Sequence, residues 1–274
     1  MQLQDPFIEI YKENNVTAVE ALFKKMASER PGFVVLLGDL TFSGKSEELW
    51  QRFDLLAQPL RDSVIPVFPV AGNHEYFGLG SQAELYRNYI PRFPQIRNRT
   101  WYVVLWKGIA VVVLNSNFSE LPDTSRREQA AWYARTLKHL EADSSIQGII
   151  VCCHHPPYTN STVVHDDRKV RKAFADPFSK TTKGILFITG HCHSYEHFSI
   201  GGKTFLVSGG GGPRQKLKAP DDPIKVDLSP IQTPQRPHHF CKVIRNGKKL
   251  DLYVEGVSED LKTWSTIEKI ELLK

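Results

Sequence analysis

The stretch 184-GILFITGHCHSYEH-197 joins a short apolar run to a turn that carries histidines. The run has the length and the β-branched content of a buried strand, and it is far shorter than the ~20 residues of a membrane helix. His191 and His193 follow the strand directly. The turn is therefore either an imidazole-rich turn or one part of a metal site, and the rest of the chain must decide between these two interpretations.

Helical and strand-like patterns alternate through the first two thirds of the chain. The helical period predicts helices at residues 16–27, 46–60, 81–90, 125–142 and 168–178. Short apolar runs predict strands at residues 33–38, 64–70, 101–106, 109–115, 146–153 and 184–189. Strands that are apolar at every position are buried on both faces, which requires helices on each side of a mostly parallel sheet.

Beyond residue 195 the helical pattern ends. Strand-like alternation at 203–209, 238–244, 249–256 and 264–272 predicts that the last third is antiparallel. Residues 213–237 are rich in proline and charge and predict a long loop. The sequence thus predicts one α/β domain over residues 1–274, built as a sandwich of two packed sheets.

The composition is that of an ordinary globular protein, with 41% hydrophobic and 24% charged residues in 274. The net charge of +5 is spread along the chain, and long Lys/Arg blocks are absent. We therefore expect neither a nucleic-acid partner nor a membrane partner. The four cysteines have no zinc-ribbon or disulfide spacing, and we interpret them as small buried apolar residues.

Four predicted strands end in residues that bind metals. The residues that follow these strands are Asp39, then Asn73 and His74, then His154 and His155, and finally His191 and His193. In α/β proteins functional groups gather at the carboxyl ends of strands, so we expect these side chains to meet at one sheet edge. Their mixed oxygen and nitrogen donors suit Mn, Fe or Zn, and the lack of thiolates argues against a structural zinc.

These motifs resemble those of the metallophosphoesterase (calcineurin-like phosphoesterase) superfamily. They are GD at 38–39, GNHE at 72–75, HHPPY at 154–158 and GHCH at 190–193, in the family's order. GHCHSYEH followed by 206-LVSGGGGP-213 is most similar to the purple acid phosphatase branch. The resemblance implies a four-layer αββα sandwich, in which two mixed sheets are flanked by helices.

The resemblance also implies roles for individual residues. Asp39 would bridge two metal ions, His193 would ligate the first ion, and Asn73, His154 and His191 would complete the second. His74 would be catalytic, as proton donor or as stabiliser of the transition state. His165 would contact the phosphate of the substrate, whereas His155 and His197 would have supporting roles.

The implied activity is metal-dependent hydrolysis of phosphate esters, with monoesters as the expected substrates, by a hydroxide held between two metal ions. Two cations ~3.5–4 Å apart lower the pKa of a bound water to ~7 and neutralise the phosphoryl oxygens. The expected substrate is a small phosphorylated molecule or a phosphoprotein. Two alternatives stay open: a phosphodiesterase acting on nucleotides, and a catalytically impaired interaction scaffold of the same fold.

The chain departs from the family pattern in two places. Purple acid phosphatases carry a tyrosine three residues after the bridging aspartate, but Phe42 stands here, so we predict a colourless protein. The family's first metal motif is also missing, because Asp5 does not follow an apolar strand. We hypothesise that a first strand lies upstream and ends in an Asp just before Met1, with Gln2 completing the motif.

The compartment depends on the true start of the chain. A complete start would indicate a cytoplasmic protein, whereas a lost signal would allow a secreted or periplasmic one. The sequence does not specify the oligomeric state.

Overall fold

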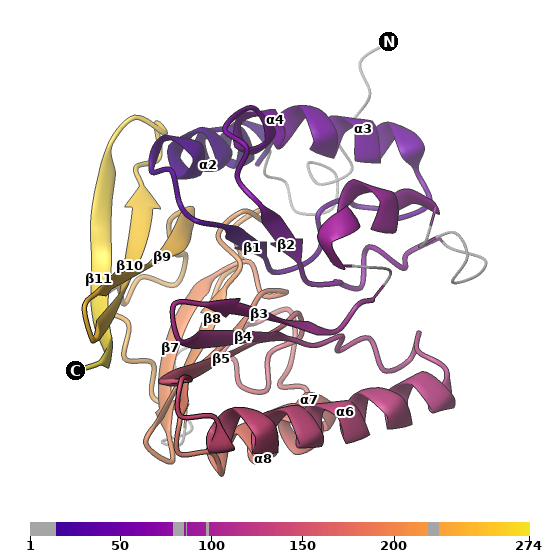
Figure 1. The fold of residues 1–274 in the computed structure, drawn as a ribbon. Coiled ribbons are helices and arrows are strands. Elements are labelled where there is room, and N and C mark those ends of the chain that lie inside the picture. Colours follow the sequence, from indigo (N-terminus) through magenta and orange to yellow (C-terminus); the bar gives the residue numbers. More distant parts are fainter. Residues whose placement is uncertain (1–14, 79–84, 86, 97–98, 219–224) are drawn as a thin grey trace.

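The computed structural model describes residues 15–78, 85, 87–96, 99–218 and 225–274, and their elements form four layers (Figure 1). The first layer contains helices α2 (Val16–Ser28), α3 (Glu47–Leu56) and α4 (Gln58–Asp62). The last layer contains α6 (Asp123–Ala142), α7 (Arg168–Val170), the π-helical turn η3 (Arg171–Ala175) and α8 (Asp176–Ser179). Two layers of strands lie between them. Among the described helices, none is long and apolar enough to cross a membrane.

One strand layer is a six-stranded sheet in the order β3-β4-β5-β6-β8-β7. Its strands are β3 (Tyr102–Trp106), β4 (Ile109–Val113), β5 (Gly148–Cys153), β6 (Gly184–Thr189), β7 (Tyr195–Ile200) and β8 (Lys203–Ser208). The four central strands β4, β5, β6 and β8 are parallel, and every residue of β4 and β5 is buried. This burial on both faces explains their continuous apolar sequence.

The prediction that the last third is antiparallel was wrong for β8. This strand pairs in parallel with β6, at Leu186 with Thr204, because the unpredicted strand β7 carries the chain back along the sheet first. At its other edge β8 pairs antiparallel with β7, and antiparallel pairing is also confirmed for β9 (His239–Asn246), β10 (Lys249–Val257) and β11 (Trp264–Leu273).

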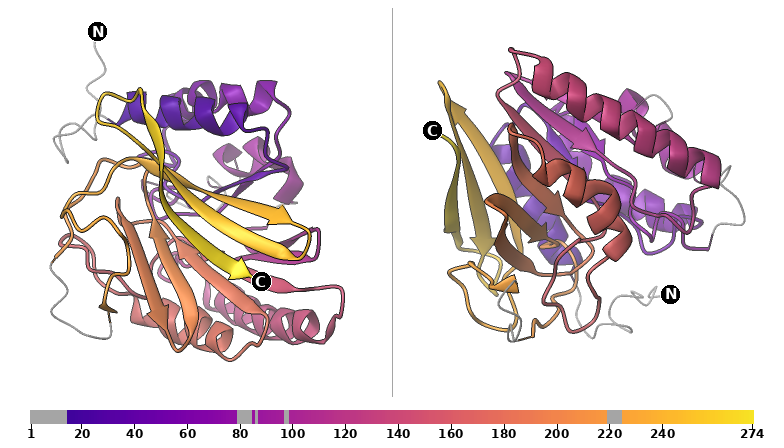
Figure 2. Two further views of the ribbon diagram at one scale, coloured as in Figure 1. Left: turned by 90° about the vertical axis from the view of Figure 1, so that its left-hand side faces the viewer. Right: turned by 90° about the horizontal axis from the view of Figure 1, so that it is seen from below.

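The second strand layer is divided into two parts. One part is the parallel pair β1 (Val34–Leu36) and β2 (Val67–Pro69), and the other is the antiparallel sheet β9-β10-β11 (Figures 1 and 2). A cavity of about 640 Å³ lies between β1 and β9, with α2 above it and the six-stranded sheet below it. At ~24 cal/mol per Å³, a dry void of this size would cost on the order of 15 kcal/mol, as much as a whole domain's stability. The cavity is therefore a place for solvent or for further polypeptide.

Three apolar clusters fill the spaces between the four layers. The first lies under α2 and α3 around Trp50, the second lies between the strand layers, and the third packs α6 against the six-stranded sheet around Phe174. The α/β class and the metallophosphoesterase-type layering are confirmed by this arrangement. The single predicted helix 46–60 is two helices, because Pro59 supplies no N–H at the start of α4. Half of the predicted helix 81–90 lies outside the described residues, and Gln2 and Asp5 also lie outside them.

Candidate metal centre

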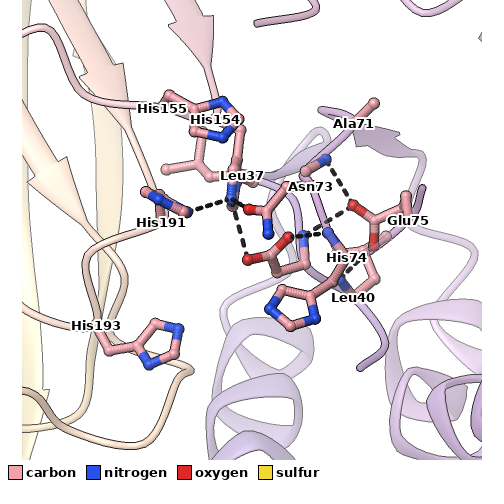
Figure 3. Close-up of polar contacts among 12 residues, drawn as sticks. Leu37, Leu40, Ala71, Asn73, His74, Glu75, His154, His155, His191 and His193 are labelled. Carbon is pink, nitrogen blue, oxygen red and sulfur yellow. Dashed lines mark hydrogen bonds and ion pairs between the residues drawn. The ribbon is translucent and has the colours of Figure 1, made fainter. Parts of the chain in front are cut away.

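The carboxyl ends of β1, β2, β5 and β6 meet at one edge of the molecule, as the sequence predicted. Each strand is followed by one of the proposed ligands: Asp39, Asn73, His154 and His191. The side chains of Asn73 and His191 point toward the imidazole of His154, which is 1% exposed (Figure 3). Side chains that lie far apart in the sequence thus form one cluster.

The Nε2 atom of His154 is the centre of this cluster. It lies 3.0 Å from Asp39 Oδ2, 3.1 Å from Asn73 Oδ1 and 3.1 Å from His191 Nδ1. A proton on Nε2 can serve only one of these three neighbours at a time. A metal cation can accept lone pairs from all of them, and imidazole, amide and carboxylate are ordinary ligands of Zn, Mn and Fe. The donor set therefore fits a metal ion.

Backbone carbonyls fix the ring orientation of three histidines. The Nδ1–H groups of His154, His74 and His193 donate to the carbonyl oxygens of Leu37 at 2.7 Å, Phe42 at 2.7 Å and Pro213 at 3.0 Å, respectively. This bond leaves Nε2 as the nitrogen that carries the lone pair in each neutral ring. Such partners are typical of metal-binding histidines, and nothing in the sequence predicts them.

His193 lies beside the main cluster rather than within it (Figure 3). The structure therefore brings the side chains of four of the five predicted ligands into contact. The fifth, His193, lies on the same turn as His191, so a second metal ion at His193 stays a prediction. His155, which the sequence analysis gave a supporting role, has a nitrogen within 4.8 Å of the ligand atoms of His154 and His191. Its Nδ1 hydrogen-bonds with Ser116 Oγ at 2.8 Å.

The two residues predicted to act on the substrate lie in different surroundings. His74 is next to the cluster, since its backbone N–H donates to Asp39 Oδ1 at 2.9 Å and its ring packs 5.1 Å from that of Phe42. His165 is exposed in the loop before α7, and its contact with substrate stays a prediction. His197 lies outside the cluster and pairs with Glu268 at 2.8 Å, in agreement with a supporting role.

Burial keeps the imidazoles of His155, His191 and His193 neutral. Desolvation, with the nearby charge of His154, lowers the pKa of His155 to about 2 and of His191 to about 3, and desolvation lowers the pKa of His193 to about 4. Burial alone would raise the pKa of Asp39, but the charge of His154 and its hydrogen bond hold this pKa well below its usual range. Burial alone would lower the pKa of His154, but the charge of Asp39 and its hydrogen bond raise this pKa above 6.5. Near neutral pH, His155, His191 and His193 therefore offer lone pairs, and Asp39 offers a carboxylate.

The glycines of the motifs act in two ways. Gly38 has a φ of +94°, and Asp39 and His191 also adopt positive φ values of 55° and 65°, which marks strained turns at two ligands. Gly72 does not adopt a positive φ. A Cβ there would lie 2.2 Å from Asp39 Oδ1, so glycine allows the two loops to approach each other closely.

Glu75 is a residue of the site to which the sequence analysis assigned no role, although it closes the GNHE motif. Its carboxylate is fully buried and accepts hydrogen bonds from the backbone N–H groups of Gly72 at 2.6 Å, Asp39 at 2.9 Å and Leu40 at 2.7 Å. Burial and the charge of Asp39 raise the pKa of Glu75 to about 7. This side chain thus ties the loop of Asp39 to the loop of Asn73.

Replacing Glu75 with glutamine is expected to lower the free energy of unfolding by about 1–3 kcal/mol. The glutamine oxygen can accept from Gly72 and Asp39, but the amide group then faces the N–H of Leu40, which loses its acceptor. Urea unfolding would measure the change, with the exposed Glu128→Gln as the matched control. Equal stability of the two variants would contradict the positioning role of Glu75.

A second buried carboxylate supports the other half of the site. Glu196 on β7 is fully buried and accepts hydrogen bonds from Thr159 Oγ1 at 3.0 Å and from the backbone N–H of Asn160 at 3.0 Å. Cys192, between the ligands His191 and His193, also contacts Thr159 Oγ1 at 3.3 Å. Glu196 therefore connects the GHCH turn with the loop that follows HHPPY. Burial raises its pKa from 4.5 to about 8.

The contribution of Glu196 to the stability of the fold is expected to fall as the pH rises from about 4.5 to about 8. Over this window folded Glu196 keeps a proton that the unfolded chain has released, so the folded state loses up to roughly 5 kcal/mol at 1.36 kcal/mol per pKa unit. Glu196→Gln, which cannot titrate, should remove most of this slope. Urea unfolding at pH 5 and pH 8 compares the two proteins, and parallel pH profiles would refute the prediction.

Known proteins share sequence and fold with this chain. The family model for calcineurin-like phosphoesterases matches residues 12–195. Probable purple acid phosphatase 20 of Arabidopsis thaliana is 27% identical over 183 residues, which are 60% of this chain and 40% of that protein. Purple acid phosphatase 22 of Arabidopsis thaliana is 25% identical over 211 residues, which are 69% of this chain and 47% of that protein. The chain spans about half the length, or less, of these curated relatives.

Solved structures with similar folds include GAP50, the anchor in the inner membrane complex of Plasmodium, with a TM-score of 0.73 and 15% identity over 96% of this chain and 85% of that chain. A dimetal phosphatase from Danio rerio has a TM-score of 0.62 and 14% identity over 94% of this chain and 88% of that chain. At such identities the likeness shows the fold alone. Since the family model covers more than half of its length, the chain belongs to the calcineurin-like phosphoesterase family.

Proposed function

We propose that this protein hydrolyses phosphate monoesters at a centre of two metal ions. The observation that carries the proposal is the position of His154 Nε2, which lies 3.0–3.1 Å from the ligand atoms of Asp39, Asn73 and His191. The family includes metal-dependent phosphoesterases, and the curated relatives are named as phosphatases.

Each ligand has a defined part in the proposed centre. Asn73, His154 and His191 would hold one ion, His193 would hold the other through Nε2, and Asp39 would contact both. Bound cations would supply Lewis acidity, which lowers the pKa of water and offsets the charge of the phosphoryl group. The choice among Mn, Fe and Zn stays open, because all three accept this mixed set of donors.

His74 is proposed as the acid that protonates the leaving oxygen. Its Nδ1–H is held by the carbonyl oxygen of Phe42, so Nε2 is the atom that would carry the transferable proton. The backbone N–H of His74 also donates to Asp39 Oδ1, which ties the position of this ring to the proposed ligands. A side chain next to the metal ligands is well placed to act on a substrate bound there.

The charge of the site supports an anionic substrate. Asp39 is the one carboxylate among the five proposed ligands, while burial keeps His191 and His193 neutral. Two divalent ions would therefore leave the centre positive, which favours the dianion of a monoester over the monoanion of a diester. Small phosphorylated molecules and phosphoproteins both fit this chemistry.

A scaffold function is the second candidate, because GAP50, described as an anchor, has a similar fold. The clustered ligands of this chain favour catalysis, since a protein used only for interaction would not need four polar side chains to converge. A phosphodiesterase acting on nucleotides is a third possibility, for which the structure offers no specific support among the described residues.

The test is hydrolysis of p-nitrophenyl phosphate and bis-p-nitrophenyl phosphate by protein loaded with Mn²⁺. We expect turnover of the monoester that stops with a chelator and returns with added Mn²⁺, and slower turnover of the diester. Preference for the diester would favour the phosphodiesterase. A protein that binds Mn²⁺ but hydrolyses neither ester, nor any member of a phosphate-ester panel, would favour the scaffold.

A further inference from the structure

Two phenylalanine rings lie beside His74, the proposed proton donor. The ring centroids of Phe42 and Phe77 are 5.1 Å and 5.9 Å from that of His74 and 5.9 Å from each other. Aromatic rings at these separations are in contact, so the three side chains form one aromatic cluster. Phe42 is the residue that stands in place of the tyrosine of purple acid phosphatases. Its ring has no oxygen to offer a metal ion, and it packs on His74 instead.

The exposure of Phe77 sets it apart from the other aromatic side chains. Its side chain is 56% exposed, although phenylalanine is among the residues that are most often buried. Among the described residues it is the one aromatic in the set of exposed large apolar side chains. Single exposed aliphatic residues are common and need no explanation. An exposed ring next to a proposed catalytic group is, in contrast, a surface that a bound molecule can cover.

Backbone contacts fix the turn that carries this exposed ring. The Phe77 N–H donates to the His74 oxygen at 3.2 Å, and the Phe77 oxygen accepts from Ser43 Oγ at 3.0 Å. The His74 oxygen also accepts from the N–H of Gly44 at 2.8 Å. A Cβ on Gly44 would overlap the Glu75 oxygen, so the two loops pack backbone against backbone. A ring on such a turn loses little freedom when a ligand binds, which favours binding.

The proposed role of His74 places the leaving group of the substrate next to these rings. The Nδ1–H of His74 donates to the Phe42 oxygen, so Nε2 is the atom that would reach the leaving oxygen. That oxygen would lie about 3 Å from Nε2 during proton transfer. The group bonded to it must then lie close to two rings whose centroids are 5.1 Å and 5.9 Å from the imidazole. An aromatic group at this position can pack on them.

We propose that Phe42 and Phe77 form a subsite for the leaving group and that the preferred substrates are aryl phosphates, in which an aromatic ring is bonded directly to the phosphate oxygen. The phosphate ester of a tyrosine side chain belongs to this class, whereas those of serine, threonine and sugars do not. The proposal rests on the proposed hydrolysis of monoesters. In that reaction water adds to phosphorus, the bond from phosphorus to the aryl oxygen breaks, and the released phenolate takes its proton from His74.

The test compares phenyl phosphate with hexafluoroisopropyl phosphate, because their leaving alcohols have similar acidity and only one of them is aromatic. With the Mn²⁺-loaded full chain we expect kcat/KM to be at least about 5-fold higher for phenyl phosphate, since the ring gains contacts with the subsite. Phe77→Ala should remove most of this preference, mainly by lowering kcat/KM for phenyl phosphate. Leu55→Ala, which removes a 75% exposed apolar side chain from α3, is the matched control and should keep the preference.

Phosphonates test the subsite without turnover. Benzylphosphonate has a CH₂ group in place of the leaving oxygen, and ethylphosphonate lacks the ring. Calorimetric titration of the Mn²⁺-loaded protein should show benzylphosphonate bound at least about 5-fold more tightly, and Phe77→Ala should bind both ligands about equally. Equal binding of the two phosphonates by the unaltered protein would overturn the subsite.

The two esters separate failure of the subsite from failure of the proposed function. Hydrolysis of hexafluoroisopropyl phosphate reports the function alone. A protein that hydrolyses both esters, and in which Phe77→Ala lowers both rates by the same factor, would keep the function and lose the subsite. A protein that hydrolyses neither ester would lose the function, and the binding of the phosphonates would still decide the subsite.

Discussion

Replacing Asp39 with asparagine is expected to reduce phosphate-ester hydrolysis by ~10³-fold or more and to weaken metal binding. The substitution keeps the shape of the side chain but removes the carboxylate charge of the proposed ligand set. Without that charge, two adjacent cations would repel each other with no anion between them. Steady-state hydrolysis of p-nitrophenyl phosphate over a range of Mn²⁺ concentrations would separate lost affinity for metal from lost turnover.

The matched control for this substitution is Asp62→Asn, which changes an exposed carboxylate at the end of α4. This control should keep both activity and metal affinity. Circular dichroism and urea unfolding must show that Asp39→Asn is folded, because Asp39 also accepts the backbone N–H of His74. A folded Asp39→Asn protein with unchanged activity would remove Asp39 from the mechanism.

Replacing His74 with alanine is expected to lower kcat by ~10²–10⁴-fold while metal binding is retained. The proposed reason is that His74 protonates the leaving oxygen and is not itself a ligand. This role predicts a dependence on the leaving group. The hydrolysis of an alkyl phosphate, which expels a strongly basic alkoxide, should fall by a much larger factor in this variant than the hydrolysis of p-nitrophenyl phosphate, which expels a stable phenolate.

The comparison of these two esters distinguishes the possible roles of His74. Equal losses on both esters would mean that His74 stabilises the phosphoryl group in the transition state and does not protonate the leaving group. Loss of bound metal from His74→Ala would contradict both roles. His165→Ala is a useful comparison. If His165 only binds the phosphate, its replacement should raise KM and leave the dependence on the leaving group unchanged.

Much of the centre was predictable because apolar strands and their last residues are visible in a sequence. Each of the runs before Asp39, Asn73, His154 and His191 was recognised as a strand, and parallel strands bring their carboxyl ends to one edge. Convergence of the four side chains followed from topology alone. The alternation of helices and strands likewise predicted the layers that support this edge.

Other features depend on contacts that a sequence does not display. The carbonyl of Leu37 that orients His154 belongs to a residue of ordinary type, and the role of Glu75 depends on two loops meeting. The parallel pairing of β8 was missed because the short hairpin after β7 looks antiparallel from its alternation. The cavity beside β1 became visible only when both of its walls were placed in space.

The most direct test of the metal centre is the metal content of the protein after loading with Mn²⁺ and extensive dialysis, measured by elemental analysis. The structure predicts at least one tightly held ion per chain, and its loss in His154→Ala, whose Nε2 lies at the centre of the ligand cluster. The exposed His139→Ala, on α6, should keep the ion. A folded protein that retains no metal, or a His154→Ala protein that retains as much as the unaltered chain, would contradict the account.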